Sequence, residues 1–268
     1  MESHGTNPQK NVIAIIPARY ASTRLPGKLL LPIAGKPLIL HTVEQAAKAV
    51  TVARVIVATD DIRIFSAVRE AQVEAVMTST DHVSGSDRLA EASAELPADL
   101  IIVNVQGDEP MISPSAIDAA VTALIDEKGV DVATTCEPID NVDDVLDPNV
   151  VKVVAGPDGM ARYFSRSPIP YLREAANSAG GLAAALEKDP KLISHFRKHT
   201  GLYVYRREFL LRFTKMTPTR LERLEMLEQL RALENGAKIK VVETSERSIG
   251  VDTLADLELV RSIIEQRQ

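Results

Sequence analysis

The chain has 268 residues, of which 45% are hydrophobic and 25% are charged, and its formal net charge is −6. This acidic balance excludes general affinity for nucleic acid or membrane surfaces, no apolar run is long enough to span a bilayer, and a single cysteine, Cys136, excludes an internal disulfide. We therefore expect a cytoplasmic globular protein whose partners are neither nucleic acids nor membranes.

The first half of the chain alternates short apolar runs with helical patterns. Strands are expected at residues 12–16, 54–59, 74–77, 100–105 and 130–135, and helices at residues 38–50, 62–72, 84–96 and 113–127. A regular strand–helix alternation predicts an α/β fold, in which a mostly parallel, doubly wound Rossmann-like sheet carries helices on both faces.

The pattern changes after residue 138. A hairpin at residues 150–165 turns at Gly156-Pro157-Asp158-Gly159, and a strand follows at residues 199–205. Residues 177–191 are expected to form a mobile loop with one short helix, as a flap over a pocket or a remote surface insertion. A helix at 218–233, a strand at 238–242 and a helix at 253–266 then return to the sheet. This predicts one domain at 11–268, in which 139–217 form mostly an antiparallel lobe, preceded by a disordered extension at 1–10.

Three cations lie in the loop that follows the first strand: Arg19, Arg24 and Lys28. Small residues around them leave backbone amides open, and the carboxyl ends of parallel strands are where open α/β sheets bind ligands. This combination predicts a site for a triphosphate held by guanidinium groups and an ammonium group. A solvated basic loop is the alternative, and the sequence contains neither a P-loop nor a dinucleotide-binding glycine motif.

A second polar stretch, Gln106-Gly107-Asp108-Glu109, follows the apolar run at residues 100–105. Mg²⁺ is bound by few carboxylates together with substrate phosphates, so Asp108 beside a triphosphate loop predicts a magnesium ligand. Asp252 offers a second carboxylate. The alternatives are an ordinary turn aspartate at 108 and a helix N-cap at 252.

Six stretches resemble, in the same order, the 3-deoxy-manno-octulosonate (Kdo) cytidylyltransferase family, also called CMP-Kdo synthetases. The resemblance covers about residues 11–264, and it departs from the family at residues 1–10 and 177–191. The stretches are Pro17-Ala18-Arg19-Tyr20-Ala21-Ser22-Thr23-Arg24-Leu25-Pro26-Gly27-Lys28, Gln106-Gly107-Asp108-Glu109-Pro110, Tyr163-Phe164-Ser165-Arg166, His199-Thr200-Gly201-Leu202-Tyr203, Met226-Leu227-Glu228-Gln229-Leu230-Arg231 and Gly250-Val251-Asp252-Thr253.

The resemblance implies a homodimeric nucleotidyltransferase of lipopolysaccharide biosynthesis that converts CTP and Kdo to CMP-Kdo and pyrophosphate with Mg²⁺. It implies that Asp108, Arg19 and Lys28 are catalytic and that Asp108 and Asp252 hold the metal. The nucleotide would be bound by Ala18, Arg19, Arg24, Lys28, Met77, Ser84 and Gly85. The sugar acid would be bound by Gln106, Arg166, His199, Tyr203, Glu228 and Gln229, and the lobe at residues 139–217 would be mostly a sugar-binding and dimerisation lobe.

Two alternatives stay open at this point. The first is a cytidylyl- or uridylyltransferase for another sugar acid, such as sialic acid, and the second is a nucleotide-binding regulator without enzymatic activity. The stretches at residues 163–166 and 199–203 favour Kdo, and the presence of both Asp108 and Asp252 favours an enzyme.

Overall fold

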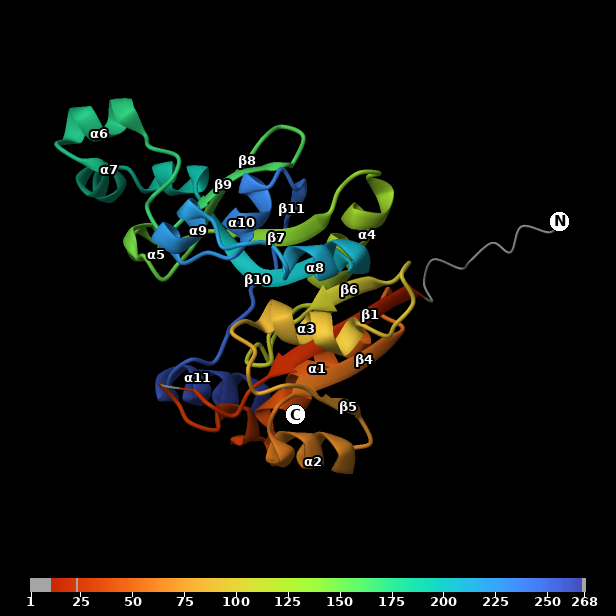
Figure 1. Cartoon of the computed structure of the whole chain (residues 1–268). Helices are drawn as coiled ribbons and strands as arrows, with labels where there is room; N and C mark the ends of the chain where they lie inside the picture. Colours follow the sequence, from red (N-terminus) through yellow and green to blue (C-terminus); the bar gives the residue numbers. More distant parts are fainter. Residues whose placement is uncertain (1–10, 23, 267–268) are drawn as a thin grey trace.

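The computed structural model describes residues 11–22 and 24–266, so the disorder expected for residues 1–10 lies outside the described residues. Within the described residues, the main sheet has nine strands, and its path runs β11-β7-β10-β6-β1-β4-β5, with β8 and β9 joined to it through β10 (Figure 1). The strands are β1 Val12–Ala18, β4 Arg54–Thr59, β5 Glu74–Met77, β6 Ile101–Asn104, β7 Val132–Pro138, β8 Lys152–Ala155, β9 Ala161–Ser165, β10 Arg197–Arg206 and β11 Ile239–Glu243. A small antiparallel sheet pairs β2, Pro32–Ile33, with β3, Lys36–Pro37.

Most of the sheet is parallel, as the strand–helix alternation predicts. β1 pairs in parallel with β4 and β6, β4 with β5, and β7 with β11. The exceptions are β10, which runs antiparallel to its neighbours β6, β7 and β8, and the antiparallel pair of β8 and β9. The loops that follow β1, β5 and β6 consequently meet at one edge of the sheet, where ligands of such folds bind.

Helices cover both faces of the sheet, which confirms the doubly wound α/β class. Alternate residues of β1 belong to two different apolar cores, since successive side chains of a strand point to opposite faces. Helices α1, α2, α4 and α11 pack on one face and α3, α8 and α10 on the other. Their bounds are α1 Leu38–Lys48, α2 Ile62–Glu70, α3 Gly85–Ser93, α4 Pro114–Asp126, α8 Arg207–Phe213, α10 Gln229–Glu234 and α11 Leu254–Glu265.

Side-chain caps fix where the helices beside the site begin. Ser84 accepts a hydrogen bond from the backbone of Asp87 and forms a capping box at the start of α3. Thr253 and Asp256 form the same motif at the start of α11. Each box satisfies amides that the first helical turn leaves without partners, so the chain segments just before α3 and α11 are held in place.

The second half of the chain differs in part from the sequence expectation. The hairpin is confirmed as β8 and β9, but the strand expected in the lobe, β10, lies inside the central sheet. The expectation of a mobile loop at residues 177–191 is wrong. Residues 173–195 form α6 Arg173–Ala179, α7 Leu182–Lys188 and the 3₁₀ helix η3 Pro190–His195. These residues pack with α5, Val142–Leu146, around a separate small core that includes Val145, Leu186 and Phe196.

The α6–α7 pair projects from the rest of the molecule in Figure 1. The structure describes all of residues 173–188, and none of them lines the pockets at the strand ends. This placement favours the surface insertion over the flap.

The prediction of one continuous helix at residues 218–233 is also wrong. The structure breaks it into α9, Arg220–Glu225, and α10, Gln229–Glu234, because Met226 adopts a left-handed conformation with φ 53° and ψ 47°. No glycine or proline occurs at residues 219–233, so no residue of this kind marks the break, and the apolar periodicity continues across it. The break turns Glu228 and Gln229 toward the sheet.

The left-handed residue gives a direct test of this break. An L residue in this conformation is strained by about 1 kcal/mol, whereas glycine is not. Met226 is 76% exposed, so its replacement removes little packing. Glycine relieves the backbone strain but makes the unfolded chain more flexible, so Met226→Gly should leave the free energy of unfolding unchanged or raise it by up to about 1 kcal/mol. Met226→Ile should lower the same quantity by about 1 to 2 kcal/mol. Urea denaturation measures the free energy of unfolding of both variants. If residue 226 lay inside a straight helix, Met226→Gly would instead be the less stable of the two.

Candidate active site

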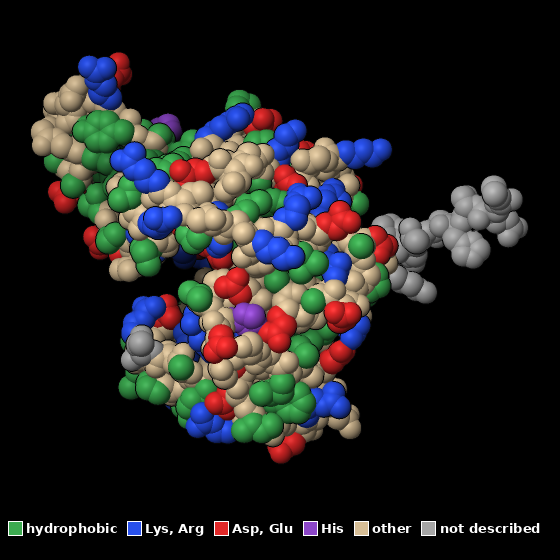
Figure 2. All heavy atoms as spheres, viewed as in Figure 1, with side chains coloured by type: hydrophobic (Ala, Val, Ile, Leu, Met, Phe, Trp, Pro, Cys, Tyr) green, Lys and Arg blue, Asp and Glu red, His purple; other side chains and the backbone are tan. Residues whose placement is uncertain are grey.

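Three adjoining pockets among the described residues share one side chain, that of Gln106. The first, the loop pocket, has a volume of about 350 Å³ and lies between the cationic loop after β1 and the turn after β6. The second, the side pocket, lies between the end of β1 and the start of α3. The third, the aromatic pocket, has a volume of about 200 Å³ and lies between α3, β10 and the α9–α10 break. Figure 2 shows a cleft between the upper and lower parts of the molecule, with lysine or arginine side chains on its lower rim.

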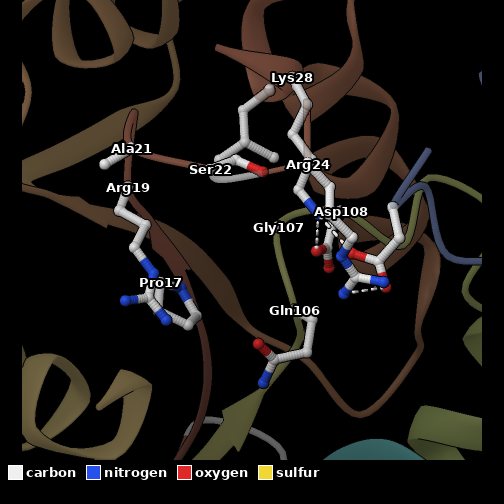
Figure 3. Close-up of a pocket in the computed structure, with 11 residues that line it drawn as sticks. Pro17, Arg19, Ala21, Ser22, Arg24, Lys28, Gln106, Gly107 and Asp108 are labelled. Carbon is white, nitrogen blue, oxygen red and sulfur yellow. Dashed lines mark hydrogen bonds and ion pairs between the residues drawn. The ribbon is translucent and has the colours of Figure 1, made fainter. Parts of the chain in front are cut away.

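The loop pocket brings together the predicted cations and both predicted carboxylates. Lys28 Nζ lies 2.5 Å from Asp108 Oδ2 and 2.9 Å from Asp252 Oδ1. Arg24 Nη2 lies 3.0 Å from Asp252 Oδ2. Arg19 lines the loop pocket and the side pocket. Figure 3 shows Arg24, Lys28 and Asp108 converging, with Arg19 and Gln106 across the pocket from them.

Lys28 is the centre of this cluster. Besides the two carboxylates, its ammonium group donates to the carbonyl oxygen of Val251 at 2.9 Å, so all three of its hydrogens have partners in the described part of the chain. Burial lowers the pKa of Lys28, but the charges and hydrogen bonds of Asp108 and Asp252 outweigh it, and the pKa lies above its ordinary value. The lysine is therefore a fixed positive charge between two acids.

The donor set fits a magnesium ion that is shared with a bound phosphate. Oxygens of Asp108 and Asp252 both lie within 3 Å of the same nitrogen, so a cation at that point would contact both residues. Within the described residues there is no group of three or more His, Cys, Asp or Glu side chains that could hold a metal. Mg²⁺ commonly takes one or two carboxylates and completes its shell with phosphate oxygens and water.

The backbone holds the two carboxylates side by side. The Val251 amide donates to the Asp108 carbonyl oxygen at 2.8 Å, which joins the segment before α11 to the turn after β6. Gly107 allows this turn to pass close to β1, because a Cβ there would lie 3.1 Å from the Pro17 carbonyl oxygen. A larger residue at 107 would push Asp108 away from its partners.

The aromatic pocket combines stacked rings with polar side chains. Tyr203 and Tyr205 lie two residues apart on β10, so both project from the same face, and their ring centroids are 5.8 Å apart. Glu228 accepts hydrogen bonds from Ser86 at 2.9 Å and from Arg231 at 2.7 Å. Burial raises the pKa of Glu228 above its ordinary value. Such a mixture of ring faces, hydroxyl, amide and carboxylate groups suits a polyhydroxylated ligand.

The pockets contain most of the residues that the sequence analysis selected. The loop pocket contains Arg19, Arg24, Lys28, Gln106, Asp108 and Asp252, the side pocket contains Ala18, Arg19, Ser84, Gly85 and Gln106, and the aromatic pocket contains Gly85, Gln106, Tyr203, Glu228 and Gln229.

Three selected residues line none of these pockets in the described structure: Met77, Arg166 and His199. Met77 is the last residue of β5 and is 44% exposed. Arg166 donates to backbone carbonyl groups, including that of Pro148 at 2.9 Å. His199 lies between the rings of Phe164 and Tyr203, where burial lowers its pKa to about 3 and keeps it neutral.

The structure adds lining residues that the sequence analysis did not select: Asn104, Tyr205 and Phe213 in the aromatic pocket, and Arg88 in the side pocket. Two of them had a signal in the sequence. Asn104 is a polar residue in an apolar strand, and Tyr205 shares the period-two face of Tyr203. Phe213 and Arg88 come from helices whose facing direction depends on tertiary packing.

A cationic loop, two carboxylates and a polar pocket at the ends of parallel strands define a nucleotide-dependent transferase. The family model described as "Cytidylyltransferase" matches residues 13–239. The 3-deoxy-manno-octulosonate cytidylyltransferase of Geobacter sulfurreducens is 53% identical over 93% of this chain and 98% of its own length. The protein of the same name from Geotalea uraniireducens is 55% identical over 93% and 97%.

A solved structure agrees with these relatives. CMP:2-keto-3-deoxy-manno-octonic acid synthetase complexed with CTP has a TM-score of 0.85 and is 41% identical, with 96% of this chain and 99% of that chain covered. The chain is an enzyme that belongs to the 3-deoxy-manno-octulosonate cytidylyltransferase family.

Proposed function

We propose that the protein transfers the cytidylyl group of CTP to Kdo and releases CMP-Kdo and pyrophosphate. The observation that carries this proposal is the meeting of three pockets at Gln106, since a transfer needs donor and acceptor to lie against one another. The side pocket would receive the cytosine and ribose, the loop pocket the triphosphate, and the aromatic pocket the sugar acid.

The reaction forms a bond between the anomeric oxygen of Kdo and the α-phosphorus of CTP and breaks the bond from that phosphorus to the bridging oxygen of the β-phosphate. Negative charge develops on the phosphoryl and leaving oxygens, which Arg19, Arg24 and Lys28 would stabilise from the loop pocket. The hydroxyl proton passes to solvent, and no side chain is assigned as its acceptor. A magnesium ion held by Asp108 and Asp252 would add positive charge at the same oxygens.

Three further features belong to this proposal through the family resemblance. The protein would act in lipopolysaccharide biosynthesis, it would work in the cytoplasm, and it would form a homodimer. Among the described residues no helix has the length and apolar character needed to cross a membrane.

Pyrophosphate release tests the proposed activity. Wild-type protein with CTP and Mg²⁺ should release pyrophosphate at a rate that depends on added Kdo, with little release without an acceptor. Sialic acid in place of Kdo should support much slower release. Equal or faster release with sialic acid would contradict the proposed acceptor, and no release with either sugar acid would contradict the proposed reaction.

Arg24→Lys tests whether the loop grips phosphate with a forked guanidinium. Lysine keeps the charge but cannot make two parallel contacts with phosphate oxygens, so the KM for CTP should rise by about tenfold. Arg162→Lys is the matched control, because its side chain is 59% exposed against 64% for Arg24 and each arginine has an aspartate partner at 3.0 Å. Unchanged KM and kcat in Arg24→Lys would mean that Arg24 is only a surface charge.

A further inference from the structure

Three residues of the stretch Tyr163-Phe164-Ser165-Arg166 converge on one carboxylate, that of Glu225, which lies outside the pockets described above. Ser165 Oγ donates to Glu225 Oε1 at 2.6 Å, and the Arg166 amide donates to Oε2 at 2.9 Å. The Tyr163 hydroxyl lies 3.4 Å from Oε1. The end of β9 therefore holds the last residue of α9.

Glu225 opens the elbow, defined here as residues 225–228, which joins α9 to α10. Arg166 also donates from Nε to the Glu225 carbonyl oxygen at 2.7 Å and from Nη2 to that of Met226 at 3.3 Å. The exposed Met226 side chain cannot anchor the elbow by packing, although its backbone is in the strained left-handed region. This conformation is held by the hydrogen bonds from Ser165 and Arg166 together with the burial of Leu227 in the core. Figure 1 shows α9 and α10 lying beside β9.

The elbow leads directly into the aromatic pocket. Glu228 is its last residue, Gln229 is the first residue of α10, and both line that pocket. Glu228 in turn accepts the hydrogen bond of Ser86, on the first turn of α3. A continuous set of contacts therefore runs from β9 through Glu225 and the elbow to Glu228 and the start of α3.

We propose that Glu225 is a positioning residue for the acceptor: it fixes the elbow so that Glu228 and Gln229 face the sugar acid. This inference rests on the proposed function, which assigns the acceptor to the aromatic pocket. It also gives the stretch at residues 163–166 a structural role, since that stretch holds the elbow. Glu225 does not line the pocket, so its effect on the reaction is transmitted through Glu228 and Gln229.

Glu225→Gln keeps the size of the side chain and removes its charge. The amide retains one acceptor oxygen, so one of the donors at Ser165 or Arg166 loses its partner. Hydrogen bonds to charged groups are among the stronger ones in proteins, and we expect the KM for Kdo to rise by about tenfold. The KM for CTP should stay within about twofold of wild type, because no residue of the elbow lines the loop pocket or the side pocket in the described structure.

Glu234→Gln is the matched control for general loosening of the two helices. The Glu234 carboxylate accepts from the Leu221 amide at 3.1 Å, so it also ties α9 to α10, but in the described structure it makes no hydrogen bond to β9 and does not line the aromatic pocket. This control should leave both KM values near wild type. If Glu225 only stabilises the fold, both variants should have a lower free energy of unfolding, and neither should change the KM for Kdo more than the KM for CTP.

A second comparison tests the contact itself. Ser165→Ala removes the shortest hydrogen bond to Glu225, and the double variant should raise the KM for Kdo no further than Glu225→Gln does alone, because both changes break the same interaction. Hydrogen exchange at the amides of residues 226–229 should be faster in Glu225→Gln than in Glu234→Gln.

The outcomes separate the two proposals. If wild-type protein shows no Kdo-dependent release of pyrophosphate, the proposed function fails, whatever the variants do. If wild type is active and Glu225→Gln has a KM for Kdo within twofold of wild type, or has the same effect as Glu234→Gln, the positioning role is overturned. A tenfold rise confined to Kdo, absent in Glu234→Gln, supports it.

Discussion

Asp108→Asn is expected to lower the rate of transfer by roughly a thousandfold or more while the protein stays folded. Asparagine has nearly the same size as aspartate and keeps an oxygen that can accept from Lys28, whose ammonium group also retains Asp252 and the Val251 carbonyl group. The cluster therefore stays hydrogen-bonded, but the metal would lose an anionic ligand. Steady-state turnover and the Mg²⁺ concentration for half-maximal rate measure the effect.

Asp131→Asn is the matched control for Asp108→Asn. Its side chain is 28% exposed against 31% for Asp108, it also pairs with a cation, Arg212, and neither residue lines any of the three pockets. We expect this control to keep near wild-type turnover and the same Mg²⁺ dependence. Turnover of Asp108→Asn within tenfold of wild type, with unchanged Mg²⁺ dependence, would remove Asp108 from the site.

Lys28→Met is expected to abolish most transfer and to change how the nucleotide-free protein responds to Mg²⁺. Methionine has a stem of similar length without charge, so Asp108 and Asp252 would face one another without a cation. Because these carboxylates are 31% and 50% exposed, the loss of stability should be only about 1 to 3 kcal/mol. Mg²⁺ could take the place of the ammonium group, so it should raise the Tm of the variant more than that of wild type.

Lys240→Met is the control for the second prediction. Lys240 is also largely buried and pairs with Glu127, but no second carboxylate shares its ammonium group in the described structure. Its Tm should respond to Mg²⁺ as wild type does. If Mg²⁺ shifts the Tm of Lys28→Met no more than that of wild type without CTP, the two carboxylates do not form a cation site.

The central part of the fold follows from local pattern. The apolar run at residues 100–105 indicates a strand covered on both faces, and the polar residues after it must then lie at the carboxyl edge of the sheet. The same reasoning applies to the loop after β1. For this reason the sequence predicts that Lys28 and Asp108 share a site, and the structure joins them at 2.5 Å.

The elements that the sequence predicts wrongly depend on distant contacts. The break at Met226 has no glycine or proline, and it is held by Ser165 and Arg166, some sixty residues earlier in the chain. Helix α7 has few large apolar residues, yet Leu186 packs into a small core with Phe196 and Val145, which no local pattern shows. The resemblance gives the residue type at 166 but not the direction of its side chain, which depends on the elbow.

The most direct test of the proposed function follows the α-phosphorus. Wild-type protein is incubated with CTP labelled at the α-phosphate, Kdo and Mg²⁺, and the products are separated and identified by mass. We predict that the label appears in CMP-Kdo in amounts equal to the pyrophosphate released, and that Kdo is required for both. Label recovered as free CMP with no sugar attached, or label that remains in CTP, would contradict the proposed transfer to Kdo.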